Sequence, residues 1–589
     1  MYKGAPMVFL LLQKVAFLLR CNKCAIFCNI IFWLFRKFCV PLHTILQILK
    51  SVSMRKSLIA LALMLSAVSY QLSAATTIRP AQQANFFLFP VQESAPEVRV
   101  RVIYENREVD HFYIMLARTG TDYTVPYDIS QYDVNHLLFI VDSDSKMLTD
   151  NTADTFDTSN IESFRPAYHH TPAYGWMNDP NGMYYDPVTK LWHLYFQYNP
   201  YGSKWQNMTW GHSTSSDLIH WEHRPNAILP DGLGTIFSGS AVIDHDNTAG
   251  FGRDAVIAMY TSAAENQTQS IAYSTDGGIT FTPYAGNPVL TADIPDFRDP
   301  KIFRNEKTGE WNLVLAAGQE VRFYASCNLK DWRYLSSFGK GYGAHGGVWE
   351  CPDMIELPVR GTNKTKWVLL LNINPGGPFG GSATQYFVGD WDGQTFTCDH
   401  RSTRWMDYGK DHYATVSFAG APDNRHVVIA WMSNWQYAND VPTMQYRSAN
   451  SLPREIDLYE DENGQLRLGV RPAKEVKHLG KHFVLKPKKG HTATLEISNN
   501  AGEVVTLTYD TQHQVLIFDR TESGLTDFSK HFPAKVKMPI FARKGDNKNQ
   551  LAVDVFVDNC SVEVFDADGR FALTNLIFPN EPMTNFKLH

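Results

Sequence analysis

Three acidic residues lie in short segments whose neighbours could adapt them for chemistry. Asp179 stands in the run Trp-Met-Asn-Asp-Pro-Asn-Gly, where dense turn-forming residues would fix an acid at a strand end. Asp299 follows Arg298, whose charge can lower the pKa of a neighbouring carboxyl group and keep it ionised. Glu350 lies between a Trp and a Cys, and removal from water by such neighbours raises a carboxyl pKa, which suits a general acid.

Each segment alone could be an ordinary surface turn, but the three together fit glycoside hydrolysis. That reaction needs two carboxyl groups across the bond to be broken, one ionised to attack and the other protonated to assist departure. A third acid can hold sugar hydroxyls and offset the positive charge that develops on the sugar. The set would suit a glycosidase if the fold brings these three segments together.

A repeated pattern in the middle of the chain predicts a fold that could do so. A polar turn followed by an aromatic residue recurs at intervals of roughly 50–60 residues, within reach of one four-stranded propeller blade. The copies are at residues 216–221, 274–281, 326–332 and 390–396. Helical periodicity is scarce. We therefore predict a β-propeller over residues 160–465, whose central funnel would gather loops from successive blades; an irregular β-sandwich with similar hairpins is the alternative.

Strand patterns also precede and follow this region, which makes the predicted fold class all-β. Period-two alternation at residues 98–102 and an apolar run at 137–141 predict a small β module over residues 76–150, in which nothing suggests chemistry. Runs at 492–497, 504–509 and 553–557, separated by turn residues, predict a C-terminal β-sandwich over residues 471–589.

The first 75 residues differ from the rest. Residues 1–53 are basic and apolar, but their best apolar run, 25–35, is shorter than the ~20 residues that a membrane span needs. A charged segment begins at Met54, an apolar core follows at 58–68, and small residues at 73–75 offer a cleavage site. We interpret residues 1–53 as a gene-model extension and 54–75 as a signal peptide for export to the periplasm or the medium. A membrane-associated leader is the alternative.

Composition excludes several classes of function. The formal net charge of −6 over 589 residues argues against a nucleic-acid partner. Four cysteines after the signal, Cys327, Cys351, Cys398 and Cys560, are too few for a disulfide scaffold. An aromatic content of 13% suits both sheet-rich folds and stacking on sugars. We expect no stable membrane insertion of the mature chain, and the sequence gives no prediction of oligomeric state.

The three acidic segments occur in the order found in glycoside hydrolase family 32, the β-fructofuranosidases, which the chain resembles from about residue 168 onward. The resemblance implies a five-bladed β-propeller followed by a β-sandwich. It implies that Asp179 is the nucleophile and that Glu350 is the general acid/base of a retaining hydrolase. It also implies that Asp299 binds fructose hydroxyls and stabilises the transition state, with Arg298 tuning the site. No cofactor or metal is implied, and histidines 169, 170 and 345 lack metal-ligand spacing.

The resemblance also implies a set of residues that bind the substrate. Asn178 and Gln197 should form hydrogen bonds with fructose, Trp205 should form a wall of the pocket, and Phe237 and Ser238 match a further binding pair. Two more residues should complete the rim: Trp176 and Trp431, with Trp435 as a competing choice for the latter role.

The function implied is hydrolysis of β-fructofuranosyl linkages in levan or inulin, with sucrose as a further candidate substrate. We expect cleavage from the chain end, because a funnel closed at its base accepts an end. Two alternatives remain open at this point: a fructosyltransferase that uses the same covalent intermediate, and a non-catalytic fructan-binding protein.

Overall fold

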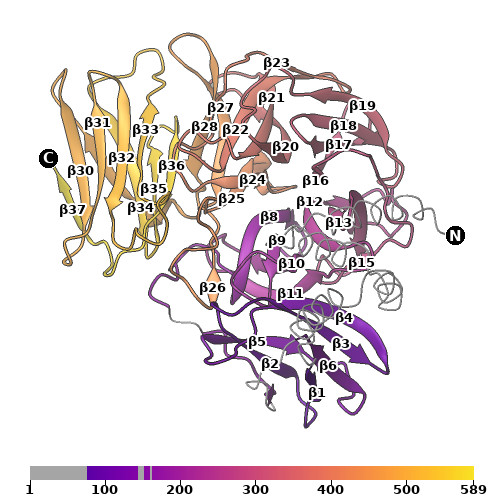
Figure 1. The fold of residues 1–589 in the computed structure, drawn as a ribbon. Coiled ribbons are helices and arrows are strands. Elements are labelled where there is room, and N and C mark those ends of the chain that lie inside the picture. Colours follow the sequence, from indigo (N-terminus) through magenta and orange to yellow (C-terminus); the bar gives the residue numbers. More distant parts are fainter. Residues whose placement is uncertain (1–75, 143–150, 160–161) are drawn as a thin grey trace, which may run out of the picture. The chain divides into compact units, whose positions relative to one another are not determined.

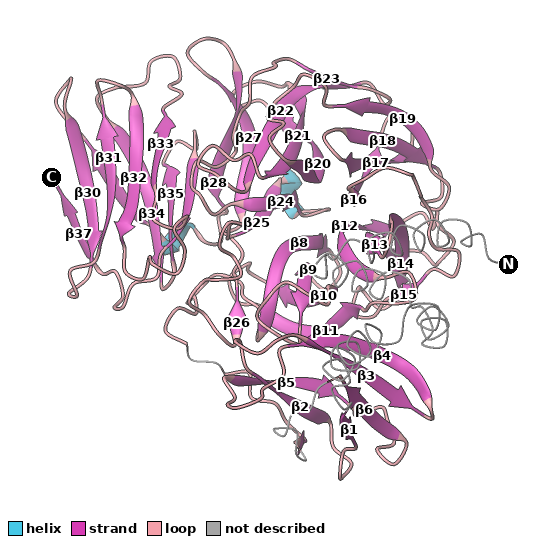
Figure 2. Cartoon of the chain, in the orientation of Figure 1, coloured by secondary structure: helices cyan, strands magenta, loops and turns pink. Residues whose placement is uncertain are grey.

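The computed structural model describes residues 76–142, 151–159 and 162–589, and their regular structure consists almost entirely of β-strands (Figure 2). Two short 3₁₀ helices occur among them, η1 (Pro422–Asn424) and η2 (Lys477–Leu479). None of the helices in these residues is long and apolar enough to cross a membrane. The gene-model extension and the signal peptide predicted for residues 1–75 lie outside the described residues.

Five antiparallel sheets of four strands form the middle of the chain (Figure 1). The strands of each sheet are given from the inside outwards. The first sheet contains β8 (Gly175–Asp186), β9 (Leu191–Asn199), β10 (Thr209–Ser215) and β11 (Glu222–Ile228), and the second contains β12 (Thr235–Asp244), β13 (Ala255–Ala263), β14 (Gln267–Ser274) and β15 (Thr282–Pro283). The third contains β16 (Phe297–Asn305), β17 (Glu310–Ala317), β18 (Val321–Ser326) and β19 (Arg333–Phe338). The fourth sheet contains β20 (Val348–Pro358), β21 (Thr365–Asn374), β22 (Ala383–Trp391) and β23 (Phe396–Cys398), and the fifth contains β24 (Tyr413–Ser417), β25 (Val427–Trp431), β27 (Arg454–Glu460) and β28 (Leu466–Pro472).

The innermost strands of these sheets neighbour one another in a closed ring. β8 contacts β12, β12 contacts β16, β16 contacts β20, β20 contacts β24, and β24 contacts β8. A short strand, β26 (Tyr446–Arg447), adds to β8 in parallel. The expected five-bladed propeller is thereby confirmed. Apolar second strands pack between the blades; residues 368–371 of β21, Val-Leu-Leu-Leu, are all fully buried, as a continuous apolar run predicts.

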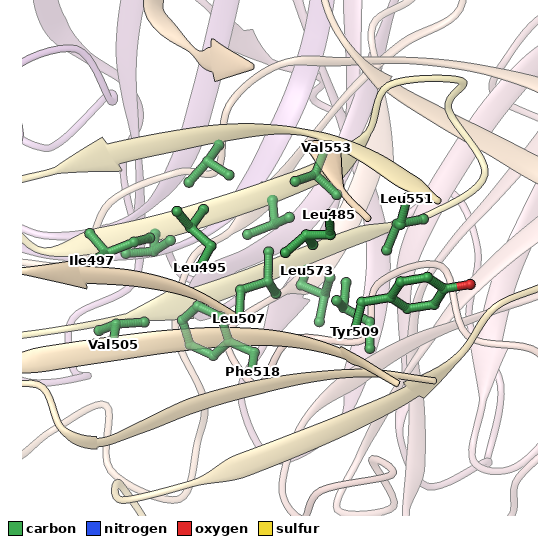
Figure 3. Packing of buried hydrophobic residues seen from close by; sticks show 14 of the residues in the cluster. Leu485, Leu495, Ile497, Val505, Leu507, Tyr509, Phe518, Leu551, Val553 and Leu573 are labelled. Atoms are coloured by element: carbon green, nitrogen blue, oxygen red, sulfur yellow. The ribbon is translucent and has the colours of Figure 1, made fainter. Parts of the chain in front are cut away.

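The C-terminal region is the expected β-sandwich. One sheet contains β29 (Lys481–Leu485), β34 (Leu551–Asp558), β35 (Ser561–Asp566) and β36 (Ala572–Leu576); the other contains β33 (Lys535–Pro539), β32 (Val515–Glu522), β31 (Val504–Asp510), β30 (Thr492–Ser498) and β37 (Asn585–Leu588). Alternate residues of β30 and β31 face inwards, among them Leu495, Ile497 and Leu507, and they meet Val553 and Leu573 of the opposite sheet (Figure 3). This alternation is the signal that predicted the sandwich.

The N-terminal module consists of two small sheets. One is formed by β1 (Thr76–Ile78), β6 (Leu137–Val141), β3 (Val98–Tyr104) and β4 (Arg107–Ile114), the other by β5 (Tyr123–Asp128), β2 (Phe86–Val91) and β7 (Thr152–Ala153). Between them lies an aromatic core in which Phe89 packs edge-on against Phe112 and Phe139 at ring distances of 5.3 and 5.1 Å. The module therefore has a hydrophobic core of its own.

Candidate active site

All five innermost strands depart from regular pairing at one end of the propeller. The register shifts lie between residues 177 and 180 in β8, 236 and 239 in β12, 298 and 301 in β16, 350 and 353 in β20, and 413 and 416 in β24. Such irregularities re-aim side chains. Asp299, Cys351 and Ala414 adopt positive φ angles of 65°, 44° and 54°, a strained conformation that concentrates at functional sites.

Asp179 accepts hydrogen bonds from three directions. Ser238 Oγ lies 2.7 Å from its Oδ2, Asn178 Nδ2 lies 3.1 Å from its Oδ1, and Cys351 Sγ lies 3.4 Å from its Oδ2. Burial raises the pKa of Asp179, the hydrogen bond from Ser238 lowers it, and the negative charge of Glu350 raises it again, with a net increase. The donors thus preserve a buried carboxylate that could attack carbon.

Asp299 is also buried and lies in the same cluster of acids. Its Oδ2 accepts hydrogen bonds from the backbone N–H of Cys351 at 2.9 Å and from the thiol of the same residue at 3.5 Å. Burial raises its pKa to about 7; Arg298 opposes that increase, and the charges of Glu350 and Asp179 add to it. The expectation that Arg298 would keep this pKa low is therefore wrong, because burial outweighs the attraction of the guanidinium group.

Arg298 pairs mainly with Glu350, although Asp299 is its neighbour in the sequence. Its Nη2 and Nε lie 2.8 and 3.2 Å from Oε1 of Glu350, whereas its closest approach to Asp299 is 4.0 Å. A third nitrogen, Nη1, lies 2.6 Å from Oδ1 of Asp296, which fixes the guanidinium group from the other side. The hydroxyl of Tyr413 donates a hydrogen bond to Oε2 of Glu350. Both oxygens of Glu350 are therefore held by donors from neighbouring blades.

Cys351 joins the acids to one another. Its thiol contacts Asp179 and Asp299 at once, and it directly follows Glu350 in β20. Burial raises the pKa of Cys351 well above its usual value, and the neighbouring carboxylates add to this effect, so the sulfur stays a neutral donor. The structure thus brings the three predicted acids into one cluster. The described residues contain no group of three or more His, Cys, Asp or Glu side chains arranged to hold a metal ion.

Comparisons with known proteins establish the family of the chain. A model of the glycosyl hydrolases family 32 N-terminal domain matches residues 169–469, and one of the family 32 C-terminal domain matches residues 456–589. The chain belongs to glycosyl hydrolase family 32. It is therefore a glycosidase. Residues 73–168 match a separate domain of unknown function, DUF4980.

Relatives of this family 32 enzyme include named fructan hydrolases. The chain is 43% identical over 480 residues to a levanase from Bacillus subtilis, covering 74% of this chain and 70% of the levanase. It is 38% identical over 499 residues to an extracellular exo-inulinase from Aspergillus niger, covering 72% and 92%. Among solved structures, an exo-inulinase from Aspergillus awamori matches with a TM-score of 0.66 at 36% identity, covering 74% of this chain and 96% of that one. A β-fructofuranosidase from Schwanniomyces occidentalis, complexed with fructosyl-erythritol, matches with a TM-score of 0.67 at 35% identity, covering 74% and 96%.

Two tryptophans predicted for the rim of the family 32 site lie beneath it instead. Trp176 and Trp431 are 0% exposed, and their rings lie 5.9 Å apart. Trp176 Nε1 donates to Oδ1 of Asn178 at 2.8 Å, which orients that amide toward Asp179. Trp435, the competing choice, is partly exposed and stacks on Trp176 at 5.8 Å. Large indole rings fill the space behind the acids, so the rim prediction for Trp176 and Trp431 is wrong.

The remaining predicted binding residues fall into two groups. Gln197 is buried in β9, and its backbone and side-chain N–H groups both reach the Asn181 side-chain oxygen at 3.0 Å in the amide orientation that satisfies both ends of Asn181. Ser238 is buried against Asp179, and Phe237 is half-buried. Trp205 is 41% exposed and lies edge-on to Phe237 at 6.0 Å. Among these four residues, only Trp205 and Phe237 have exposed surface that a sugar could contact.

Sequence reasoning missed Tyr413. It begins β24, the innermost strand of the fifth blade, at the same kind of register shift that carries the acids in the other blades. Burial and the charge of Glu350 raise the pKa of Tyr413 well above its usual value, so its hydroxyl remains a donor. Once a propeller is predicted, the start of each innermost strand is a place to search, and the segment Asp-His-Tyr-Ala-Thr at 411–415 could have been found that way.

Proposed function

We propose that this enzyme is a retaining β-fructofuranosidase in which Asp179 attacks the sugar and Glu350 serves as general acid and base. The observation that supports this most is the position of Cys351, which directly follows Glu350 and reaches Asp179 with its thiol at 3.4 Å. The negative charge of Glu350 also acts on both Asp179 and Asp299, which supports placing the two carboxyl groups in one site. Retaining glycosidases need a separation of about 5 Å between the two groups.

The reaction proceeds in two displacements. A carboxylate oxygen of Asp179 forms a bond to the anomeric carbon of fructose while the bond to the leaving oxygen breaks, and that oxygen takes a proton from Glu350. Water then attacks the same carbon, gives a proton back to Glu350, and breaks the ester bond to Asp179. Two inversions retain the configuration. Asp299 does not react; it binds fructose hydroxyls and offsets the positive charge that builds up on the ring.

The substrates proposed are levan and inulin, with sucrose as a further candidate, and the product is fructose released from a chain end. The printed names of the relatives, levanase, exo-inulinase and fructofuranosidase, support this range. We further propose that residues 54–75 direct export, which agrees with the word "extracellular" in the names of several relatives.

Product analysis tests the proposal directly. The purified protein is incubated separately with levan, inulin and sucrose, and products are followed over time by chromatography. We expect fructose as the early product; a ladder of oligomers would mean internal cleavage, and lengthened products would mean transfer to sugar. Proton NMR in the first minutes should show the β-anomer of fructofuranose. Early appearance of the α-anomer would exclude the double displacement.

Two variants separate the roles of the acids. Asp179→Ala should lower kcat by about 10⁴-fold or more, because the covalent route is lost. Glu350→Gln should lose far less activity on fructosides with activated leaving groups than on sucrose, since a good leaving group needs little protonation. An equal loss on both kinds of substrate would contradict the acid role. Asp519→Ala, in the sandwich, is a matched control that should keep full activity.

A further inference from the structure

The N-terminal module and the propeller together line an open cavity of about 320 Å³. Residues 77–141 belong to the same compact unit as the propeller. The module contributes Glu97 and Tyr113 to the lining, and the propeller contributes Trp205, Gln206 and Asn439, with Asp440 beside them. A volume of this size lies at the lower end of the range of ligand sites, roughly 300–1,000 Å³.

Specific contacts hold the two walls of this cavity together. The side chain of Asn207 accepts a hydrogen bond from the backbone N–H of Tyr113 at 2.9 Å and donates one to the carbonyl of the same residue at 2.8 Å. Tyr201 stacks on Phe112 of the module at 4.0 Å. Gln206 Nε2 donates to Glu97 Oε2 at 3.1 Å across the cavity edge. The module is therefore docked on the loop that carries Trp205, and the cavity is a built feature of the chain.

The lining has the chemistry of a site for a neutral sugar. Tyr113 and Trp205 are 38% and 41% exposed, and such rings can stack on the apolar face of a sugar. Carboxylate and amide groups of Glu97, Asn439 and Asp440 stand among them. These groups accept and donate hydrogen bonds to hydroxyls. The lining also includes Lys204, whose ammonium group lies 3.7 Å from Glu93, so its charge is shared with a carboxylate, and the two carboxylates of Glu97 and Asp440 disfavour an anionic ligand.

Trp205 lines this cavity and also contacts a residue next to the candidate active site. The Trp205 ring lies edge-on to Phe237 at 6.0 Å, and the next residue, Ser238, donates its hydroxyl hydrogen to Asp179. A sugar chain with its terminal unit at Asp179 that ran past Trp205 would come to the cavity that Trp205 lines together with the N-terminal module.

We propose that this cavity is a subsite for the sugar units that lie beyond the bond to be cleaved, and that the N-terminal module thereby makes the enzyme favour long fructan chains over a disaccharide. The inference rests on the proposed function, because it takes the ligand to be a fructan. It gives residues 76–142 a role in substrate selection rather than in the reaction itself.

The experiment compares substrates of different length. Tyr113→Ala should lower kcat/KM on inulin or levan by about three- to tenfold, the range that a lost aromatic contact gives, and leave kcat/KM on sucrose within about twofold. Glu97→Gln, which keeps the shape of the side chain, should lower kcat/KM in the same substrates to a smaller extent. Tyr334→Ala removes a more exposed tyrosine, 54% against 38%, from the third blade and should change neither value. Equal losses on sucrose and on fructans, or no loss on either, would overturn the proposal.

A binding measurement separates this proposal from the proposed function. Affinity electrophoresis through gels containing inulin, levan or dextran is performed on Asp179→Ala and on the double variant with Tyr113→Ala. We expect either fructan to retard the first protein more than the second, and dextran to retard neither. Identical mobility of both proteins in both fructans would overturn the subsite. Wild-type protein that binds fructan but hydrolyses none would instead overturn the proposed function alone.

Discussion

Ser238 donates its hydroxyl hydrogen to Oδ2 of Asp179 across 2.7 Å, although 59 residues separate the two in the chain. Each stands at a register shift in the innermost strand of its blade, β12 and β8, so the bond joins two blades at the point where chemistry is proposed. Burial raises the pKa of Asp179, and this hydrogen bond is the largest influence that lowers it. The hydroxyl therefore keeps the proposed nucleophile charged.

Ser238→Ala should make the enzyme more sensitive to acid. A nucleophile must be ionised, so kcat/KM should rise with pH through the raised pKa of Asp179 in the wild type. Loss of a hydrogen bond to the charged form raises that pKa further, and we expect the acid limb of the pH profile to move up by about one unit. The measurement is kcat/KM on sucrose between pH 4 and pH 8. The apparent value belongs to the cluster of acids as a whole, since they titrate together.

Ser240→Ala is the matched control for this shift. Ser240 lies two residues further along β12, and its hydroxyl donates to the carbonyl of Pro300 at 2.9 Å without touching Asp179. Its removal should lower thermal stability and leave the acid limb where it is. A limb that stays in place in Ser238→Ala, or moves equally in both variants, would contradict the role assigned to the hydroxyl.

Tyr413→Phe should lower kcat/KM on sucrose by about 10- to 100-fold. The variant keeps the ring and deletes the donor to Oε2 of Glu350, and hydrogen bonds to charged groups contribute about 1.5–3 kcal/mol. Tyr413 acts here as a positioning residue, so kcat should fall while KM changes little. Tyr437→Phe removes an equally buried hydroxyl, bonded to Asp411 near the sandwich, and should affect stability rather than kcat. A change confined to KM in Tyr413→Phe would contradict the assignment.

Cys351 should resist alkylation although it contacts two of the acids. The thiolate is the reactive form, and burial together with nearby carboxylates raises the pKa of this thiol well above its usual value. Iodoacetamide should modify the exposed Cys327 and leave both Cys351 and activity intact. Mass spectrometry of tryptic peptides, with urea-unfolded protein as the control in which both residues react, gives the measurement. Modification of Cys351 in the folded enzyme would show that the acid cluster is open to reagents.

The fold could be predicted from the sequence because its signals are local. Turns that precede an aromatic residue mark the propeller hairpins, and alternation at residues 492–497 marks a sandwich strand. The three acids could be found because each stands in an unusual segment. Their environment could not be predicted, because it depends on partners from other blades: Arg298 lies next to Asp299 in sequence, yet its guanidinium group reaches Glu350, 52 residues away.

The sequence also could not establish which of the tryptophans near the acids are buried. A tryptophan near an acid can form a rim or a floor, and only the packing of Trp176 against Trp431 and Trp435 places the first two below the surface. The cavity at Tyr113 also depends on packing between segments that are far apart in the chain. Nothing in the segment that carries Tyr113 suggests chemistry until Asn207, 94 residues later, fixes its backbone beside Trp205.

His169 should make the stability of the protein depend on pH. It lies buried between Asp558 at 2.7 Å and Glu563 at 2.9 Å, both in the sandwich. Burial alone would lower its pKa, but the bonds to these carboxylates raise it to about 9. A raised pKa in the folded state stabilises the protein fully below the unfolded value of about 6.5, and this contribution is lost as pH rises through about 9. The urea concentration at the unfolding midpoint of the wild type should therefore decrease as the pH is raised from 6.5 to 9.5.

His169→Gln tests the source of this slope. At pH 6 the variant leaves the buried Asp558 without its cation, whereas Glu563 keeps its pair with Arg454 at 2.6 Å. It should lower the free energy of unfolding by about 3 kcal/mol. The difference from wild type should shrink by pH 9.5, because the wild-type imidazolium has by then lost its proton. His220→Gln, which breaks an exposed pair with Asp217 at 2.7 Å, should cost about 1 kcal/mol at most at either pH. His169→Gln could instead lower the free energy of unfolding by the same amount at both pH values. That result would show that the charge of His169 is not the source of the pH dependence.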